Sequence, residues 1–425
     1  MEKFMRSFPI KAMQADQPEK GRLKVHVTTE AGAVPVPDAR VSVSYTGEQG
    51  QPLQEVSTDS SGNTPELELS APPLEYSVEP GEQQPYSEYT LSVTAPGFEP
   101  VEVVGTEILP EVTALQEIRM LPQQGEAYER FVIPAHTLFG NYPPKIAEPE
   151  IQPTNETGEI VLSRVVVPEY VIVHDGVPTD STAANYWVKY RDYIKNVASS
   201  EIYATWTDAA IRANVLAIMS FTLNRVYTEF YRNRGYDFTI TSSTAFDHKW
   251  IPNRNIYNTI SQVVDEMFGN YLSRPNVKQP ILTQYCDGRR VTCPEWMSQW
   301  GSQALGEQGY SAIQILRSYY GESMYINTAE EISGVPYSWP GSNLTEGSRG
   351  QKVLQLQEQL NRIAKAYPAM PKISEDGIYG PATANSVRAF QAIFGLPETG
   401  IVDYPTWYKV SEIYVAVSRI AELNP

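Results

Sequence analysis

The sequence contains few of the residues on which many catalytic centres are built. Its 425 residues include only two cysteines, Cys286 and Cys293, and four histidines. So few histidines leave little room for an imidazole-based zinc site. No Gly-x-Ser-x-Gly, Walker or His-Glu-x-x-His motif occurs, so no metal and no cofactor are expected. The cysteines are compatible with free thiols, a local disulfide or half of a metal site.

Positive charge and long apolar runs are also scarce. The 33 Lys and Arg residues stand against 50 Asp and Glu residues, a net charge of -17. Nucleic acid and anionic membrane surfaces are therefore not expected as partners, because both attract basic proteins. No apolar run approaches the ~20 residues of a membrane-spanning helix. The N-terminus also lacks the apolar region of a conventional secretory signal peptide.

Composition changes along the chain and predicts several domains, as the length also suggests. Short alternating strands separated by turn residues are typical of a β-sandwich. A stretch rich in Pro, Gly and Glu follows and favours a linker that proteases can reach. The expected parts are a flexible leader at 1–20, an all-β sandwich at 21–122, a linker at 123–160, an α+β domain at 161–335 and a small helical domain at 341–422.

Several helices are predicted in the α+β domain. Thr207 followed by Asp208 fits an N-cap with an acidic first turn, and the apolar spacing beyond it predicts a helix over 208–230. Further helices are expected over 260–272, from near Trp296, and over 311–320. Two histidines outside these helices, His136 in the linker and His174 at a strand end, are expected to be solvated.

Glu201 is a carboxylate with unusual surroundings. Its neighbours include Ile202, Tyr203 and Trp206, and no cation is adjacent. Glycosidases normally pair two carboxylates, but one suffices when a hydroxyl of the substrate itself attacks. That carboxyl must be protonated near neutral pH, which an apolar setting favours. Glu201 is therefore a candidate acid and base, and a surface residue beside a helix start is the alternative.

Two blocks of sequence around Glu201 resemble the stage II sporulation protein D family. The first is Tyr193-Ile-Lys-Asn-Val-Ala-Ser-Ser-Glu201, and the second contains Met297-Ser-Gln-Trp-Gly. The resemblance implies a peptidoglycan lytic transglycosylase, which cleaves between N-acetylmuramic acid and N-acetylglucosamine and leaves a 1,6-anhydro end. The family's catalytic glutamate falls on Glu201. The chain departs from the family at Met219, where an arginine is usual.

Candidate substrate-binding residues lie in or near these two blocks. Ser298 is equally suited to helix capping, and a surface salt bridge is the ordinary role for Arg212. Glu295 is a candidate second carboxylate, with a solvated position before a helix as the alternative. The candidates for substrate binding are Trp206, Arg212, Thr283, Tyr285, Ser298 and Gln299.

The last 80 residues carry three blocks that resemble the small three-helix peptidoglycan-binding domain. They are Gly347-Ser-Arg-Gly-Gln-Lys-Val353, Asp376-Gly-Ile-Tyr-Gly-Pro-Ala-Thr383 and Gly395-Leu-Pro-Glu-Thr-Gly-Ile-Val-Asp403. The resemblance implies peptidoglycan as a partner. Tyr379 and Trp407 are expected to be packing residues rather than glycan platforms.

The order of the three modules extends the resemblance over nearly the whole chain. Residues 37–41, 58–62 and 95–98 resemble a transthyretin-like sandwich of the carboxypeptidase-regulatory or Cna-B type. The three modules together resemble SleC-type spore cortex-lytic enzymes. This implies a zymogen in the cortex or coat region of the spore, activated at germination by a serine protease of the Csp type. The alternatives are a non-catalytic wall-binding scaffold and a muramidase-type hydrolase.

Overall fold

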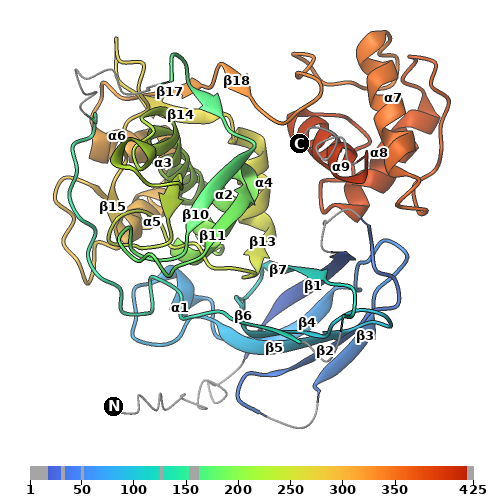
Figure 1. Cartoon of the computed structure of the whole chain (residues 1–425). Coiled ribbons are helices and arrows are strands. Elements are labelled where there is room, and N and C mark those ends of the chain that lie inside the picture. Colours follow the sequence, from blue (N-terminus) through green and yellow to red (C-terminus); the bar gives the residue numbers. More distant parts are fainter. Residues whose placement is uncertain (1–17, 30–33, 49–51, 125–127, 153–161, 419–425) are drawn as a thin grey trace.

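The structure is a computed structural model that describes residues 18–29, 34–48, 52–124, 128–152 and 162–418 (Figure 1). The predicted leader lies outside these residues except for 18–20. Three parts follow one another along the chain: a β domain, a central domain of helices and short strands, and a helical C-terminal domain. In Figure 1 the β domain lies below the other two, which stand side by side. The predicted multidomain arrangement of sheets and helices is confirmed.

The N-terminal domain consists of two sheets that enclose an apolar core. Leu23, Val25 and Val27 alternate with less buried residues, so one face of β1 points into the core. One sheet contains β1 (Glu19–Thr29), β4 (Leu67–Ala71) and β7 (Thr113–Met120). The other has the order β3-β2-β5-β6-β8, with β2 (Arg40–Tyr45), β3 (Gln54–Ser57), β5 (Ser87–Thr94), β6 (Val101–Ile108) and β8 (Glu129–Val132).

The N-terminal and central domains share a sheet and a buried ion pair. Strand β13 (Ile256–Tyr257) of the central domain pairs antiparallel with β7 at the edge of the first sheet. Beside it, the Arg254 guanidinium lies 2.8 Å from the Glu107 carboxylate, and both side chains are buried. Backbone pairing plus a buried ion pair makes this an extensive contact between the two domains.

The segment predicted to be a linker has ordered contacts along its described part. Strand β8 pairs in parallel with β6, so the second sheet extends beyond residue 122. Residues 133–152, which we call the strap, then run along the central domain. His136 in the strap is buried and its ring lies 4.5 Å from that of Tyr203, which contradicts the prediction that it is solvated. Local sequence does not reveal these contacts because every partner lies far away along the chain.

The central domain is built around α3 (Asp208–Tyr227), which is buried on nearly all sides. The hydroxyl of Thr207 accepts from the Ala210 N–H, which confirms the predicted N-cap. The other helices are α2 (Tyr190–Glu201), α4 (Asn258–Met267), α5 (Gln299–Glu307) and α6 (Ala312–Tyr320). The strands are β9 (Val166–Val167), β10 (Tyr170–His174), β11 (Asn185–Lys189), β12 (Ile240–Thr241), β14 (Asn270–Ser273), β15 (Tyr285–Cys286), β16 (Met297–Ser298), β17 (Tyr325–Thr328) and β18 (Glu331–Ile332).

Two expectations for the central domain are wrong. The helix predicted over 260–272 ends at Met267, and the residues after Gly269 form β14, which pairs with β17. Glycine is a poor helix former, and the pairing with β17 outweighs the apolar periodicity of the segment. His174 is buried rather than solvated, since its ring stacks on Phe238 and its Nδ1 lies 2.8 Å from the Asn185 amide oxygen.

The C-terminal domain packs three helices around an apolar core. These are α7 (Gln351–Ile363), α8 (Pro381–Ile393) and α9 (Tyr404–Ser418). Tyr379 and Trp407 are buried, as expected of packing residues. The amide oxygen of Gln357 accepts from the N–H groups of Asp376 and Gly377, which fixes the loop before α8. Among the described helices, none is both long enough and apolar enough to cross a membrane.

Candidate functional site

Glu201 lies at the end of α2, at the base of a buried polar cluster. Its side chain is 3% exposed. One carboxylate oxygen accepts from the Lys249 backbone N–H at 2.6 Å, and the other accepts from the Tyr285 hydroxyl. The Gln299 amide donates to the Glu201 backbone carbonyl at 3.0 Å. The structure therefore brings Tyr285 and Gln299, two of the predicted residues, into contact with Glu201.

Burial and the nearby cations and hydrogen-bond donors act in opposite directions on the pKa of the Glu201 carboxyl. Burial raises the pKa of its carboxyl above the ordinary range, while Lys145, Tyr285 and Lys249 act in the opposite direction. The Lys145 ammonium lies 5.2 Å from the ring centroids of both Phe221 and Tyr285. Burial also lowers the pKa of Lys145 itself, and Glu201 counteracts this. The site is thus a carboxyl that holds its proton more strongly than an exposed one, beside a desolvated ammonium.

His248 adds a neutral imidazole to the same cluster. Burial, with Lys145 and Arg225, holds its pKa well below the ordinary range. Its Nδ1 lies 3.1 Å from the Tyr193 hydroxyl, and its ring stacks on Tyr285 at 5.9 Å. Its Nε2 is buried without a hydrogen-bond partner among the described residues. The His248 ring therefore packs on Tyr285, whose hydroxyl donates to Glu201, and keeps one buried ring nitrogen without a partner in the described part of the chain.

The strap covers this cluster. Near its start, Thr137 makes two hydrogen bonds to the backbone carbonyl of Ser200, the residue before Glu201. Lys145 inserts between the rings of Phe221 and Tyr285 and donates to the Asp247 carbonyl. Near its end, Glu148 forms a two-pronged ion pair with the buried Arg225, at 2.6 and 2.9 Å. In this arrangement the Glu201 carboxyl is closed off from solvent, since the residue is 3% exposed and both carboxylate oxygens accept hydrogen bonds from the protein.

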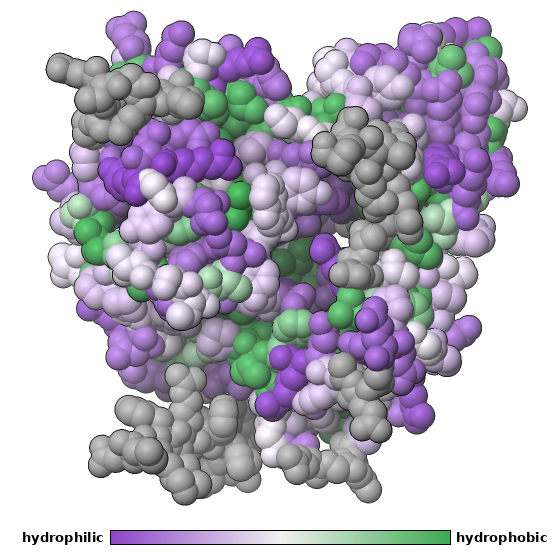
Figure 2. Space-filling model, in the orientation of Figure 1, coloured by the Kyte–Doolittle hydropathy of each residue, from purple (hydrophilic) through white to green (hydrophobic). Residues whose placement is uncertain are grey.

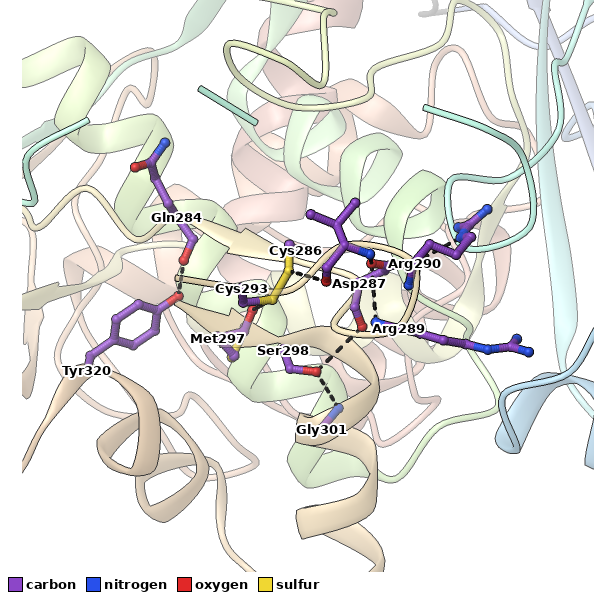
Figure 3. Close-up of a disulfide and its surroundings, with 11 residues drawn as sticks. Gln284, Cys286, Asp287, Arg289, Arg290, Cys293, Met297, Ser298, Gly301 and Tyr320 are labelled. Carbon is purple, nitrogen blue, oxygen red and sulfur yellow. Dashed lines mark hydrogen bonds and ion pairs between the residues drawn. A yellow bond between two sulfur atoms is a disulfide. The ribbon is translucent and has the colours of Figure 1, made fainter. Parts of the chain in front are cut away.

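A disulfide loop fastens the first part of the strap. Cys286 and Cys293, whose state the sequence left open, form a disulfide (Figure 3). Arg290 extends away from this loop and donates to the carbonyls of Thr137, Phe139 and Gly140 in the strap. Arg289 also leaves the loop, but it reaches the N-terminal domain at Glu82.

Trp206 and Arg212 lie in different surroundings from Glu201. The Trp206 indole N–H donates to the Ser77 carbonyl at 2.9 Å, so this ring joins the central and N-terminal domains. Arg212 forms ion pairs with Asp208 and Glu266 on the surface. Both line a shallow cavity of about 160 Å³ with Thr259 and Gln262, away from the residues that contact the Glu201 carboxyl. Substrate contacts of Trp206 and Arg212 remain predictions.

The other candidates make structural contacts. The Thr283 hydroxyl donates to the Ala217 carbonyl inside the domain. Ser298 caps α5 by accepting from the Gly301 N–H at 2.9 Å, which is the alternative that the sequence allowed. Met219 is fully buried on α3, and Glu295 is exposed. An arginine at position 219 would need a buried counter-charge.

Sequence reasoning missed four residues of the cluster around Glu201: Lys145, His248, Lys249 and Tyr193. The first three come from other segments and no local pattern marks them, whereas Tyr193 lies on α2 itself. Of these, Tyr193 lies within the first family block and two turns of helix before Glu201, so its position on the same helix could have suggested it. Among the described residues there is no group of three or more metal-ligating side chains.

Residues 349–410 match the family model described as a putative peptidoglycan binding domain. This range begins just before α7 and ends within α9. The zinc D-Ala-D-Ala carboxypeptidase of Streptomyces albus G is 40% identical to the chain over 78 residues. That similarity covers 18% of the chain and 29% of the carboxypeptidase, so it concerns only a part of either protein.

Several solved structures resemble parts of the chain. The SleB N-terminal domain is 26% identical over 18% of this chain and 99% of its own, with a TM-score of 0.16. The Bacillus anthracis TIE protein is 18% identical over 24% of this chain and 17% of its own, with a TM-score of 0.17. TM-scores this low carry no argument about the fold. It is the family match at residues 349–410 that supports peptidoglycan as the partner of the C-terminal domain.

Proposed function

We propose that the chain is a peptidoglycan lytic transglycosylase of the spore cortex, in which Glu201 is both acid and base. The observation that carries the proposal is the buried Glu201 carboxyl, which burial keeps protonated to higher pH than an exposed glutamate. The family match at residues 349–410 supports peptidoglycan as the polymer. The resemblance of the two blocks around Glu201 supports the class of reaction.

In the proposed reaction, Glu201 transfers one proton in each direction. The protonated carboxyl gives its proton to the oxygen between N-acetylmuramic acid and N-acetylglucosamine, and the bond from C1 to that oxygen breaks. The carboxylate then takes the proton of the C6 hydroxyl of the same muramic acid, whose oxygen bonds to C1 and closes the 1,6-anhydro ring. The Tyr285 hydroxyl and the Lys249 N–H stabilise the carboxylate between the two steps.

A single carboxylate fits this site better than a pair. Asp247 also lies in the cluster, but its oxygens accept from Arg225, Tyr231 and the Thr241 N–H and hydroxyl. A carboxylate with its lone pairs so occupied is unsuited to activating water. This favours attack by a substrate hydroxyl over attack by water.

The proposal includes storage as a zymogen. The strap holds Lys145 near the Glu201 carboxyl, which is 3% exposed and therefore offers no open approach to a glycosidic oxygen. Activation then requires the strap to move, which a proteolytic cut during germination would permit. The resemblance to SleC-type enzymes supports a serine protease of the Csp type as the activator and the spore as the location.

Product analysis tests the reaction. The full chain is incubated with cortex sacculi before and after limited proteolysis, and the released fragments are identified by mass spectrometry. We expect 1,6-anhydro fragments after cleavage, their loss in Glu201→Gln, and normal release from the matched control Glu295→Gln, since Glu295 is exposed.

Either of two other results would contradict the proposal and identify a different function. Fragments with reducing ends would identify a muramidase-type hydrolase. A chain that binds sacculi but releases nothing before or after cleavage would identify a wall-binding scaffold, the alternative that the covered Glu201 carboxyl favours.

A further inference from the structure

The N-terminal domain covers two segments of the central domain that lead away from Glu201. The first, residues 202–206, follows Glu201 directly at the end of α2. The second, residues 249–257, begins at Lys249, whose N–H donates to the Glu201 carboxyl, and ends in β13. Both reach the N-terminal domain within about five residues, which span at most about 18 Å. Figure 1 and Figure 2 show this domain against the lower side of the central domain.

Side chains at the ends of both segments donate to acceptors of the N-terminal domain. The Trp206 indole N–H donates to the Ser77 carbonyl, and the Thr205 hydroxyl donates to the Ser77 hydroxyl, each at 2.9 Å. The Tyr257 hydroxyl donates to the Glu107 carbonyl at 3.1 Å. Removal of the N-terminal domain leaves all of these donors without those acceptors, so another ligand with acceptor groups could take their place.

Two ion pairs across the same contact have the same polarity. The Arg254 guanidinium lies 2.8 Å from the Glu107 carboxylate, and the Arg289 guanidinium lies 2.8 Å from the Glu82 carboxylate. In each pair the central domain supplies the cation and the N-terminal domain supplies the anion. The N-terminal domain therefore offers the central domain the groups of an anionic, acceptor-rich ligand.

The ion pair between Arg254 and Glu107 leaves hydrogen-bonding groups unused. Only Nη2 of Arg254 donates to Glu107, while Nη1 of Arg254 and Oε1 of Glu107 are buried without a partner among the described residues. The Arg254 Nε donates to the Asn255 carbonyl at 2.8 Å, so its own domain already orients the guanidinium. Arginine and carboxylate frequently form two parallel hydrogen bonds, a stronger and more specific arrangement than the single bond present here. A free carboxylate could satisfy Arg254 more completely than Glu107 does.

We propose that this face of the central domain binds a carboxylate-bearing part of the glycan strand once the N-terminal domain has left. Arg254 would recognise the carboxylate, and Trp206 and Tyr257 would donate to neighbouring carbonyl or hydroxyl oxygens. The N-terminal domain then blocks the site by supplying the same kinds of group from Glu107 and Ser77. The inference rests on the proposed function, both for peptidoglycan as the polymer and for removal of the N-terminal domain. In peptidoglycan the carboxylate belongs either to the lactyl group of a peptide-free muramic acid or to the stem peptide.

Calorimetric titration of the Glu201→Gln chain tests the site without turnover, before and after a cut at an engineered site in 153–161. Three probes are compared. Chitotetraose has no carboxylate, the peptide-free tetrasaccharide of alternating N-acetylglucosamine and N-acetylmuramic acid has lactyl carboxylates, and the same tetrasaccharide with stem peptides has peptide carboxylates. After the cut, at least one carboxylate-bearing probe should bind roughly tenfold or more tightly than chitotetraose, the effect of hydrogen bonds to a charged group. The probe that shows this preference identifies the source of the carboxylate, and the uncut chain, which should lack the preference, gives the baseline.

Substitution of Arg254 tests whether it causes the preference. Arg254→Met is combined with Glu107→Leu, because leaving either charge buried alone would destabilise the uncut chain. The double variant is expected to bind all three probes with the affinity that the parent chain has for chitotetraose. Arg254→Lys keeps the charge but not the two-pronged geometry, and it should lose at least about threefold of the preference. The matched control is Arg164→Met, since Arg164 pairs with Glu331 at the surface of the same domain.

Two outcomes would overturn the inference. One is a cut chain that binds the three probes equally or not at all, and the other is a preference that both Arg254 variants retain. Arg254→Lys keeps the buried charge paired, so it remains informative if the double variant fails to fold. Release of anhydro fragments by the activated wild-type chain is measured separately. Release without an Arg254-dependent preference would refute this site alone, whereas the preference without release would refute only the proposed reaction.

Discussion

Burial of the Glu201 carboxyl makes the stability of the full chain depend on pH. Because the folded pKa is raised above that of the unfolded chain, the native state binds more protons in the interval between the two values. Stability is therefore fully present below the unfolded pKa and falls as pH rises through this interval. We expect Glu201→Gln to lack this component, so that the variant gains stability relative to the wild type as pH rises above about 4.5.

Urea unfolding at several pH values, followed by tryptophan fluorescence, checks this expectation. Parallel curves for the two proteins would show that the folded and unfolded pKa values of Glu201 are equal. Glu295→Gln is the control, since Glu295 is exposed.

Arg225 offers a prediction about stability alone. Its guanidinium is fully buried between Glu148 and Asp247, so Arg225→Ala leaves two carboxylates without their cation. Breaking a buried pair in this way costs about 3–5 kcal/mol. Arg212→Ala, which removes surface pairs to Asp208 and Glu266, should cost no more than about 1 kcal/mol. If both variants lowered the urea midpoint of unfolding by the same amount, the buried ion pairs of Arg225 would be no more important for stability than the surface pairs of Arg212.

The sequence could predict the part of the site that lies within or near the family blocks. Glu201 and Gln299 lie within the blocks and Tyr285 lies between them; all three were candidates from the sequence, and the structure brings their atoms together. Lys145 and His248 could not be predicted, because they are separated from Glu201 by dozens of residues and carry no motif. Trp206 was chosen for being near in sequence, yet its indole N–H donates to Ser77 in another domain. Nearness to Glu201 in the sequence is therefore a poor guide to which residues contact its carboxyl, because several of those residues come from distant loops.

At the level of elements, the disulfide loop and the strap form one unit. Arg290 donates to three carbonyls of the strap, whereas the Arg289 side chain donates to Gly81 and Glu82 in the N-terminal domain. Arg290→Ala should therefore loosen the strap, and Arg289→Ala should not. Hydrogen exchange of the Thr137 and Phe139 amides in the uncleaved chain is the measurement. Protection that is equal in the two variants would show that Arg290 does not hold the strap.

Elements with strong local signals were predictable, and those held by distant pairing were not. The helix at 208–227 has an N-cap and a continuous apolar pattern, so its start and type followed from sequence. Strand β8 lies in a stretch rich in Pro and Glu, and only its pairing with β6 makes it a strand. Strand β14 likewise depends on β17, more than 50 residues later. In both cases the hydrogen bonds to a distant strand outweigh the local conformational preference of the segment.

At the scale of the whole molecule, composition predicted three modules but not how they contact one another. The N-terminal domain reaches the central domain through β13, through Glu107 and through Ser77, and it touches the C-terminal domain where the Asn63 amide donates to Ile393. Each contact joins residues more than 100 positions apart. Removal of the N-terminal domain therefore has to break a shared sheet as well as a covalent bond.

The strap makes the position of an activating cut decisive. Its end is tied to the central domain by Glu148 with Arg225 and by Glu150 with Arg274, the latter at 2.7 Å for both prongs. A cut before the strap, at an engineered site in 125–127, leaves Lys145 covalently joined to the central domain and should leave Glu201 covered. A cut after it, at a site in 153–161, makes the strap part of the released piece. Only the second cut is expected to produce activity on cortex sacculi, with the uncut chain as the baseline. Equal activity after either cut would contradict this expectation. It would mean that the strap moves away from Glu201 while still joined to the central domain, and that the N-terminal domain alone blocks the substrate.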